Sequence, residues 1–98
     1  MKYSFHPEAQ YELNQAVDFY QEGNTKLGLD FLKEVHSSIL RIIEFPKAFP
    51  PLSKNTRRCL LNRFPFSVIY QFKQNEICIL AITHLARKPG YWKERSKS

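Results

Sequence analysis

The sequence lacks most of the residues that would tie a protein to a metal, a disulfide framework or a membrane. Its two cysteines, Cys59 and Cys78, are too far apart for a zinc motif, and both lie in apolar stretches. No apolar run approaches the roughly 18 residues of a membrane span, and the first ten residues contain no apolar signal region. These absences predict a cytoplasmic protein with reduced thiols and with neither metal nor cofactor.

Acidic residues are also scarce in one half of the chain. Residues 1–53 carry five Lys or Arg and seven Asp or Glu, a balance of −2. Residues 54–98 carry ten Lys or Arg and only two Asp or Glu, a balance of +8. A basic half indicates an anionic partner, and the alternative is a basic surface that only keeps the protein in solution.

The 98 residues contain no internal repeat and no linker, so residues 1–98 are predicted to form one domain. Residues 2–5 alternate as in a short strand, and apolar spacings of three and four predict a helix to about residue 21 and a longer one to about residue 44. Gly28 lies on the apolar stripe of the second helix, where it permits close helix approach.

After a proline-rich loop the period becomes alternating, which predicts strands over "RRCLLNRF", "FSVIYQFK" and "ICILAITHLA". The tail "KPGYWKERSKS" is predicted to contain one helical turn. The expected fold is therefore α+β, with the order β-α-α-β-β-β: a two-helix hairpin packed on a mainly antiparallel sheet.

Basic, histidine and aromatic residues gather near the ends of the last predicted strands. Alternation places Arg63 on one face with Cys59 and Leu61, and His84 on one face with Leu80 and Ile82. If those strands are neighbours, the cluster meets at one edge of the sheet. It comprises Arg57, Arg58, Arg63, His84, Arg87 and Tyr91.

Such a cluster suits RNA cleavage by the 2′-hydroxyl of the RNA itself. His84 could carry a proton, since an unperturbed histidine has a pKa of about 6.5. Arg63 and Arg87 could hold the phosphate, and Tyr91 could stack on a base or supply a proton. The candidate catalytic residues are thus Arg63, His84, Arg87 and Tyr91. The candidate nucleic-acid-binding residues are Lys54, Arg57, Arg58, Lys88, Trp92 and Lys93.

Each of these residues has an ordinary structural alternative. His84 could be a surface residue, and Arg63 could only protect an edge strand. Trp92 could anchor the tail on the core, which is favoured over base stacking. The sequence shows no catalytic triad, phosphate loop or metal cluster.

Three stretches together resemble the RelE/ParE superfamily of bacterial toxins from type II toxin–antitoxin modules, the plasmid stabilisation proteins. They are "FHPEAQYELNQAVDFY", "RRCLLNRFPFSVIYQF" and "AITHLARKPGYW", in that order along nearly the whole chain. The resemblance implies two helices on an antiparallel sheet, and a toxin neutralised by a cognate antitoxin that binds across its hydrophobic surfaces.

The resemblance leaves two targets open. The RelE-like branch cuts messenger RNA on the ribosome, and Arg63, His84, Arg87 and Tyr91 match its basic and aromatic cluster. The ParE-like branch poisons DNA gyrase and lacks that set. The long helical hairpin is similar to the ParE-like branch, and only Lys54 precedes "NTRR" where the RelE-like branch has a lysine pair. A non-toxic RNA-binding module or an inactive toxin relative is the further alternative.

Overall fold

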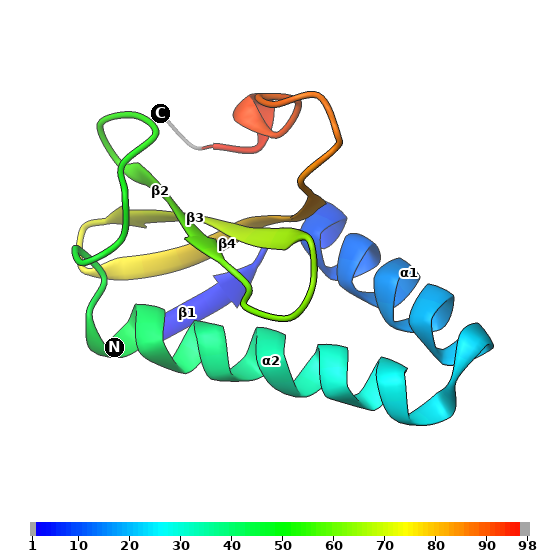
Figure 1. Cartoon of the computed structure of the whole chain (residues 1–98). Coiled ribbons are helices and arrows are strands. Elements are labelled where there is room, and N and C mark those ends of the chain that lie inside the picture. The colour runs from blue at the N-terminus through cyan, green and yellow to red at the C-terminus, as the bar shows by residue number, and fades with distance from the viewer. Residues whose placement is uncertain (1, 97–98) are drawn as a thin grey trace.

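A computed structural model describes residues 2–96 of the chain (Figure 1). The order of elements confirms the predicted α+β fold with a strand, two helices and three strands. The elements are β1 (Lys2–Phe5), α1 (Pro7–Gly23), α2 (Thr25–Glu44), β2 (Thr56–Leu60), β3 (Phe66–Lys73), β4 (Glu76–His84) and a 3₁₀ turn, η1 (Lys93–Arg95). Within residues 2–96, no helix has the length and apolar character that crossing a membrane requires.

The helical hairpin is joined by a single residue, Asn24. Its backbone N–H donates to the Tyr20 carbonyl oxygen and closes α1, while its side chain accepts the Lys26 N–H at 2.9 Å and starts α2. At Gly28 a Cβ atom would lie 2.9 Å from the Gln21 Cβ and 3.1 Å from the Val17 carbonyl oxygen. The glycine therefore allows the close helix contact that the sequence predicts.

The sheet has the strand order β1-β4-β3-β2, with β1 parallel to β4 and the other pairs antiparallel. The predicted mainly antiparallel sheet is thus confirmed, and β4 is a central strand. Gln74 and Asn75 join β3 to β4 with φ values of 53° and 62°. Two consecutive positive φ angles fit a tight hairpin turn whose twist matches that of the strands.

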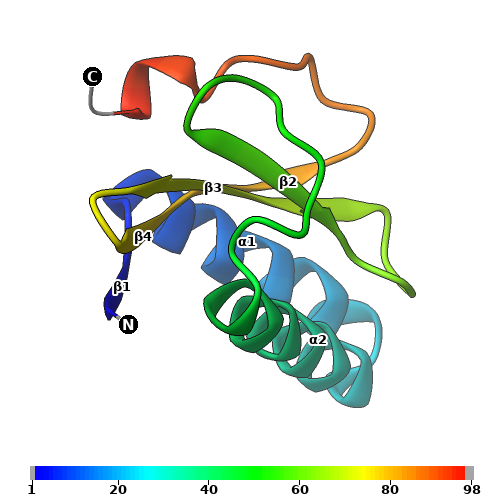
Figure 2. The ribbon, with the colours of Figure 1, turned by 90° about the vertical axis from the view of Figure 1, so that its left-hand side faces the viewer.

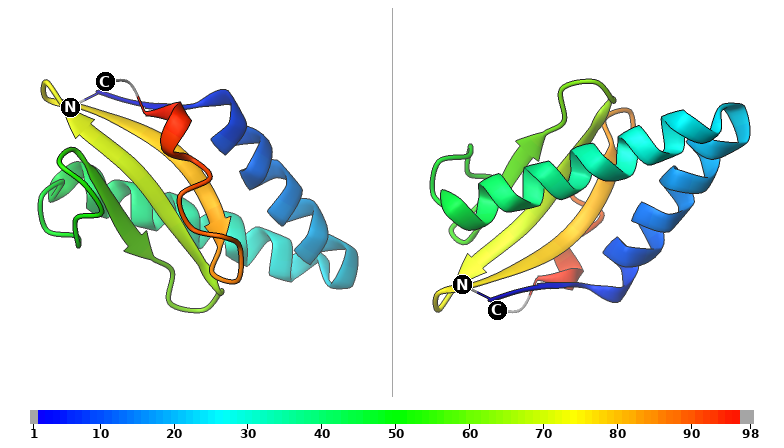
Figure 3. Two further views of the ribbon diagram at one scale, coloured as in Figure 1. Left: turned by 90° about the horizontal axis from the view of Figure 1, so that it is seen from above. Right: turned by 90° about the horizontal axis from the view of Figure 1, so that it is seen from below.

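Two different layers cover the two faces of the sheet (Figure 2). The helices pack on one face, where the buried side chains include Phe31, Val68 and Tyr70. The C-terminal segment, residues 85–96, crosses the opposite face and buries Trp92 against Ile69 and other residues of the sheet. Seen from above, this segment lies over β4 (Figure 3, left).

A β-bulge in β4 makes one sequence prediction wrong. Ile69 pairs with Ala81 but Tyr70 pairs with Ile79, so Leu80 is an extra residue. Leu80 packs in the cluster beneath the C-terminal segment, whereas Ile82 packs in the helix-side core. Simple alternation had placed Leu80 and Ile82 on one face.

The predicted strand that contained Arg63 is also shorter than expected. β2 ends at Leu60, and Arg63 lies in the loop before β3. The backbone N–H groups of Asn62 and Arg63 donate to the Glu34 carboxylate of α2 instead of to a neighbouring strand. Arg63 therefore has no place on the sheet face shared by Cys59 and Leu61.

Candidate functional site

The centre of the candidate site is the carboxylate of Glu12 on α1, whose side chain is only 9% exposed. It accepts the Tyr91 hydroxyl at 2.7 Å and the Ile82 backbone N–H at 3.1 Å. The Arg95 guanidinium forms two further hydrogen bonds to it, at 2.9 and 3.1 Å. A buried carboxylate is stable only with such partners, because burial disfavours its charge.

The position of Glu12 follows from where β1 stops. β1 pairs with β4 only as far as Phe5 opposite Ile79, so the backbone of β4 beyond that point needs other partners. Glu12 accepts the Ile82 N–H, and Arg95 donates to the Leu80 carbonyl oxygen at 3.0 Å. The Glu12–Arg95 ion pair, which joins α1 to the C-terminal segment, thus supplies hydrogen-bond partners for the part of β4 that β1 does not reach.

Tyr91 lies between two guanidinium groups. The Arg87 Cζ is 3.7 Å from the centre of its ring and the Arg95 Cζ is 5.0 Å from it. Burial raises the pKa of Tyr91; a hydrogen bond with Thr83 opposes this shift, and the hydrogen bond and charge of Glu12 add to it. The hydroxyl therefore remains a hydrogen-bond donor to Glu12.

Arg95 is held as a cation. Burial acts to lower the pKa of its guanidinium, but its hydrogen bonds and charge interaction with Glu12 more than offset this, so the pKa is raised. Its side chain is 13% exposed. Arg87, in contrast, is 53% exposed and contacts Glu12 at 3.5 Å, at the edge of the cluster.

His84 is exposed at the end of β4, beside this cluster. Its Nδ1 accepts the Ala86 backbone N–H at 3.0 Å, and its ring meets that of Phe66 edge to face at 5.1 Å. His84 and Arg87 line a cleft of about 280 Å³ with Glu12, and a second of about 90 Å³ with Arg58. The structure thus brings these three basic residues to neighbouring clefts.

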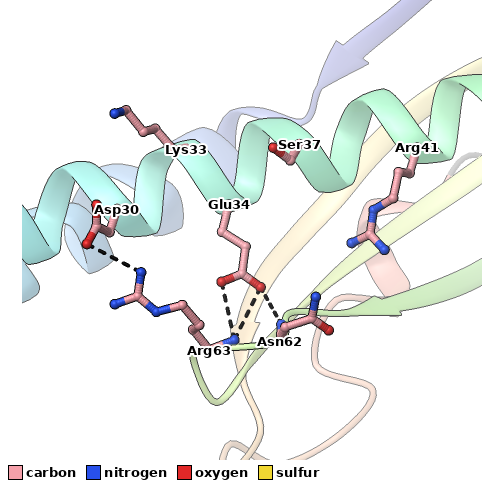
Figure 4. A pocket seen from close by; sticks show the side chains of 7 residues that line it. All are labelled: Asp30, Lys33, Glu34, Ser37, Arg41, Asn62 and Arg63. Carbon is pink, nitrogen blue, oxygen red and sulfur yellow. Dashed lines mark hydrogen bonds and ion pairs between the residues drawn. The ribbon is translucent and has the colours of Figure 1, made fainter.

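Arg63 lies apart from that group. Its guanidinium pairs with Asp30 of α2 at 3.3 Å, and its backbone N–H faces Glu34 (Figure 4). The polar cleft of about 560 Å³ that it lines contains neither His84 nor Arg87. Of the four candidate catalytic residues, Arg87 and Tyr91 share Glu12, His84 adjoins Arg87, and Arg63 belongs to a different cleft.

The candidate nucleic-acid-binding residues are spread over the molecule. Lys54 and Arg57 line a basic cleft at the other end of the sheet, whereas Arg58 lines the small cleft beside His84. Lys88 and Lys93 are exposed on the C-terminal segment. Trp92 is 8% exposed and packs in the core, which favours the anchor interpretation over base stacking.

The sequence interpretation missed Glu12 and Arg95. Glu12 had a signal: it lies three residues after Ala9 and four before Ala16, on the buried face of α1. Arg95 had none, since its role depends on how the C-terminal segment folds back onto α1. Among residues 2–96, no three His, Cys, Asp or Glu side chains gather as a metal site would require.

The fold defines a class of small α+β proteins in which a helical hairpin covers one face of a four-stranded sheet. A solved structure titled "Chromosomal ParDE TA system from P. aeruginosa" matches with a TM-score of 0.73 and 24% sequence identity. The match covers 86% of this chain and 95% of that chain, and it establishes the likeness of fold. No curated protein matches the sequence.

Residues 3–89 match the family described as "ParE toxin of type II toxin-antitoxin system, parDE". Because the match spans most of the 98 residues, the chain belongs to this family. The resemblance to RelE/ParE toxins that the sequence shows is thereby confirmed.

Proposed function

We propose that the protein is a growth-arresting toxin that acts by binding and poisoning DNA gyrase rather than by cutting RNA. The observation that carries this proposal is that the four candidate catalytic residues do not form one site, because Arg63 lines a different cleft from His84 and Arg87. Arg63 is paired with Asp30, and Arg87 and Tyr91 are paired with Glu12. Family membership supports the toxin, and the geometry of these residues supports the non-enzymatic target.

The Glu12 carboxylate already takes arginine contacts of the kind that a substrate phosphate would need. Phosphate in an RNase site must be held by arginine guanidinium groups that are free to approach it. Here the same groups already neutralise a buried carboxylate, and a phosphate beside Glu12 would meet a like charge. This arrangement stabilises the fold and disfavours phosphoryl chemistry at the same place.

The proposal includes a cognate antitoxin as the neutralising partner. Val17, Gly28, Leu29 and Leu32 line a groove of about 560 Å³ along the helical hairpin, and both leucines are exposed. An apolar groove between two helices suits an amphipathic segment of a partner protein. Toxin neutralisation by such a segment would cover this surface.

Messenger RNA cleavage remains the second candidate, on one specific observation. His84 and Arg87 line the same small cleft as Arg58, so a proton carrier and two cations do lie together. If this cleft is catalytic, His84 is the one histidine among its lining residues and the candidate to carry a proton. Replacing His84 should therefore abolish toxicity if the protein cuts RNA, and should leave toxicity unchanged if the protein poisons gyrase.

The deciding experiment combines gyrase assays with induction of the toxin in bacterial cells. The purified protein should inhibit supercoiling by gyrase and cause cleaved plasmid to accumulate. Induced cells should stop growing with DNA damage signalling and with intact transcript 5′ ends. His84→Ala, which changes an exposed side chain, should remain toxic and fully folded.

Three results would overturn the gyrase proposal. New transcript ends within coding regions, lost in His84→Ala, would assign the protein to the ribosome-dependent RNases. No effect on gyrase at concentrations that arrest growth would exclude gyrase as the target. Absence of any growth arrest would leave an inactive relative or a non-toxic RNA-binding module.

A further inference from the structure

A basic cleft lies at the end of the sheet remote from His84. Its volume is about 400 Å³, and residues from the loop after α2, the loop before β2, β2, and the β3–β4 hairpin converge on it. Four of the lining side chains are cationic and none is acidic. The lining residues are Lys47, Lys54, Asn55, Arg57, Phe72, Lys73 and Gln74.

The charges of this cleft are not compensated by the protein's own carboxylates. Within residues 2–96, Lys47, Lys54 and Lys73 form no ion pair. Glu76 is opposite Lys73 in the β3–β4 register, but it neither pairs with Lys73 nor lines the cleft. Cations gathered in this way repel one another, and a bound anion relieves that repulsion.

Three other arginines of the basic half contrast with this cleft. Arg63 pairs with Asp30, and Arg87 and Arg95 both pair with Glu12. At the cleft, the Arg57 guanidinium instead donates to the Phe49 backbone carbonyl oxygen at 2.7 Å. That contact keeps the full positive charge of Arg57 while fixing its position.

The backbone around the cleft is held in place by hydrogen bonds. The Phe72 N–H donates to the Asn55 carbonyl oxygen at 2.8 Å, which ties the loop carrying Lys54 to the end of β3. The Arg57–Phe49 bond ties β2 to the loop carrying Lys47. The cations are therefore presented from positions that the fold defines, although the lysine side chains themselves can adjust.

The lining chemistry points to phosphates rather than to bases. Lysine ammonium groups act as point charges for phosphate oxygens, and the amides of Asn55 and Gln74 can donate further hydrogen bonds. Phe72 is the only aromatic residue of the cleft and is partly buried in the core, so no stacking platform for unpaired bases is present there. Sequence-independent contact with the backbone of a duplex fits these features.

We propose that the cleft formed by Lys47, Lys54, Arg57 and Lys73 binds the phosphate backbone of a nucleic-acid duplex. This site shares no lining residue with the helical groove proposed for the antitoxin. Duplex DNA and duplex RNA offer the same phosphate chemistry, and the experiment distinguishes them.

The test measures binding by the isolated full chain, so its outcome does not depend on the gyrase proposal. Fluorescence anisotropy is recorded with labelled DNA and RNA duplexes of about 20 base pairs, from about 50 mM salt upwards. Lys54→Gln/Lys73→Gln is compared with Lys26→Gln/Lys33→Gln, which removes the same charge from exposed positions on α2. Circular dichroism and thermal melting confirm that both variants are folded.

The cleft variant should bind duplex about tenfold more weakly at low salt, and its slope of log K against log salt should be shallower by about 1.8, or 0.9 for each lost contact with DNA. The α2 variant should stay close to the parent protein. A preference for DNA or for RNA in these measurements identifies the natural source of the phosphates.

Equal weakening in the two variants would overturn the proposal, because binding would then reflect net charge alone. Unchanged binding in the cleft variant would overturn it as well. Binding of inorganic tripolyphosphate without any binding of either duplex would assign the cleft to a small polyanion and refute the duplex.

Discussion

At the scale of single residues, Tyr70 links the sheet to the end of the helical layer. Its ring is fully buried, and its hydroxyl donates to the Pro46 carbonyl oxygen at 2.6 Å. Burial raises the pKa of Tyr70 from 10.0 to about 12, and the charge of Arg57 opposes this only in part. A pKa that is higher in the folded than in the unfolded state contributes stability below pH 10.0, which is lost as the pH rises towards 12.

Replacing Tyr70 by Phe should therefore make the free energy of unfolding vary less with pH in the alkaline range. At neutral pH the variant should lose about 1–3 kcal/mol, because the Pro46 carbonyl oxygen loses its donor. Between about pH 8 and about pH 11, the parent's free energy of unfolding should fall by about 1.4 kcal/mol more than the variant's. Urea unfolding at both pH values measures this difference.

Tyr11→Phe is the control for this prediction, since Tyr11 is an exposed tyrosine on α1. It should keep the alkaline fall of the parent protein. A Tyr70→Phe variant with the same alkaline fall as the parent would show that Tyr70 does not cause it.

At the scale of elements, two glycines of the helical hairpin should respond in opposite directions to the same substitution. A Cβ at Gly23 would have nothing within 4 Å, whereas one at Gly28 would lie 2.9 Å from the Gln21 Cβ. Gly23→Ala should stabilise the protein by up to about 1 kcal/mol through helix propensity. Gly28→Ala should destabilise it by about 1–3 kcal/mol, because the contact with α1 must open.

Thermal and urea unfolding of the two variants measure whether each substitution raises or lowers stability. Gly28→Ala more stable than the parent would mean that α1 and α2 separate readily. Gly23→Ala less stable than the parent would mean that the C-terminus of α1 needs glycine for a reason other than space.

Elements whose pattern is local were predictable, and those that depend on pairing were not. The helices and Gly28 follow from apolar spacing and from caps such as Asn24, all within a few residues. The β-bulge at Leu80 arises from the register between β3 and β4, which alternation along β4 alone does not contain. The early end of β2 depends on Glu34, a residue of α2 that takes over the backbone N–H groups of the loop.

The candidate site was predictable only in part, for the same reason. His84, Arg87 and Tyr91 are close in sequence, so their proximity in space was foreseeable. The contacts of Arg87 and Tyr91 with Glu12 were not foreseeable, because Glu12 lies 75 and 79 residues before them in the sequence. Arg63 was wrongly expected to join them on a strand face, since its ion pair with Asp30 also forms between distant segments.

At the scale of the whole molecule, the carboxylate of Glu12 joins the C-terminal segment to α1 through two ion pairs. α1 has its own apolar contacts with the sheet through residues such as Ala9 and Leu13. The C-terminal segment has less apolar packing, through Trp92 and Tyr91, and most of its side-chain polar contacts converge on Glu12. Loss of the Glu12 charge should therefore release this segment before the helices unfold.

Glu12→Gln tests this coupling, since it leaves the charge of Arg95 buried and unpaired. The variant should lose about 3 kcal/mol or more of stability. Trp92 is the only tryptophan of the sequence, so its fluorescence reports docking of the segment, while far-UV circular dichroism reports mainly the helices. In the parent protein both signals should change at one urea concentration, as in a two-state transition.

In Glu12→Gln the fluorescence should change at a lower urea concentration than the dichroism, because the segment would then undock separately. Glu22→Gln, which removes the same charge at an exposed position on α1, should leave the two transitions coincident. Coincident transitions in Glu12→Gln, or full parental stability, would mean that the packing of Trp92 and the remaining hydrogen bonds hold the segment without the charge of Glu12. The contacts around Glu12 would then have a role other than stabilising the fold. Phosphate binding at Arg87 would need to be tested.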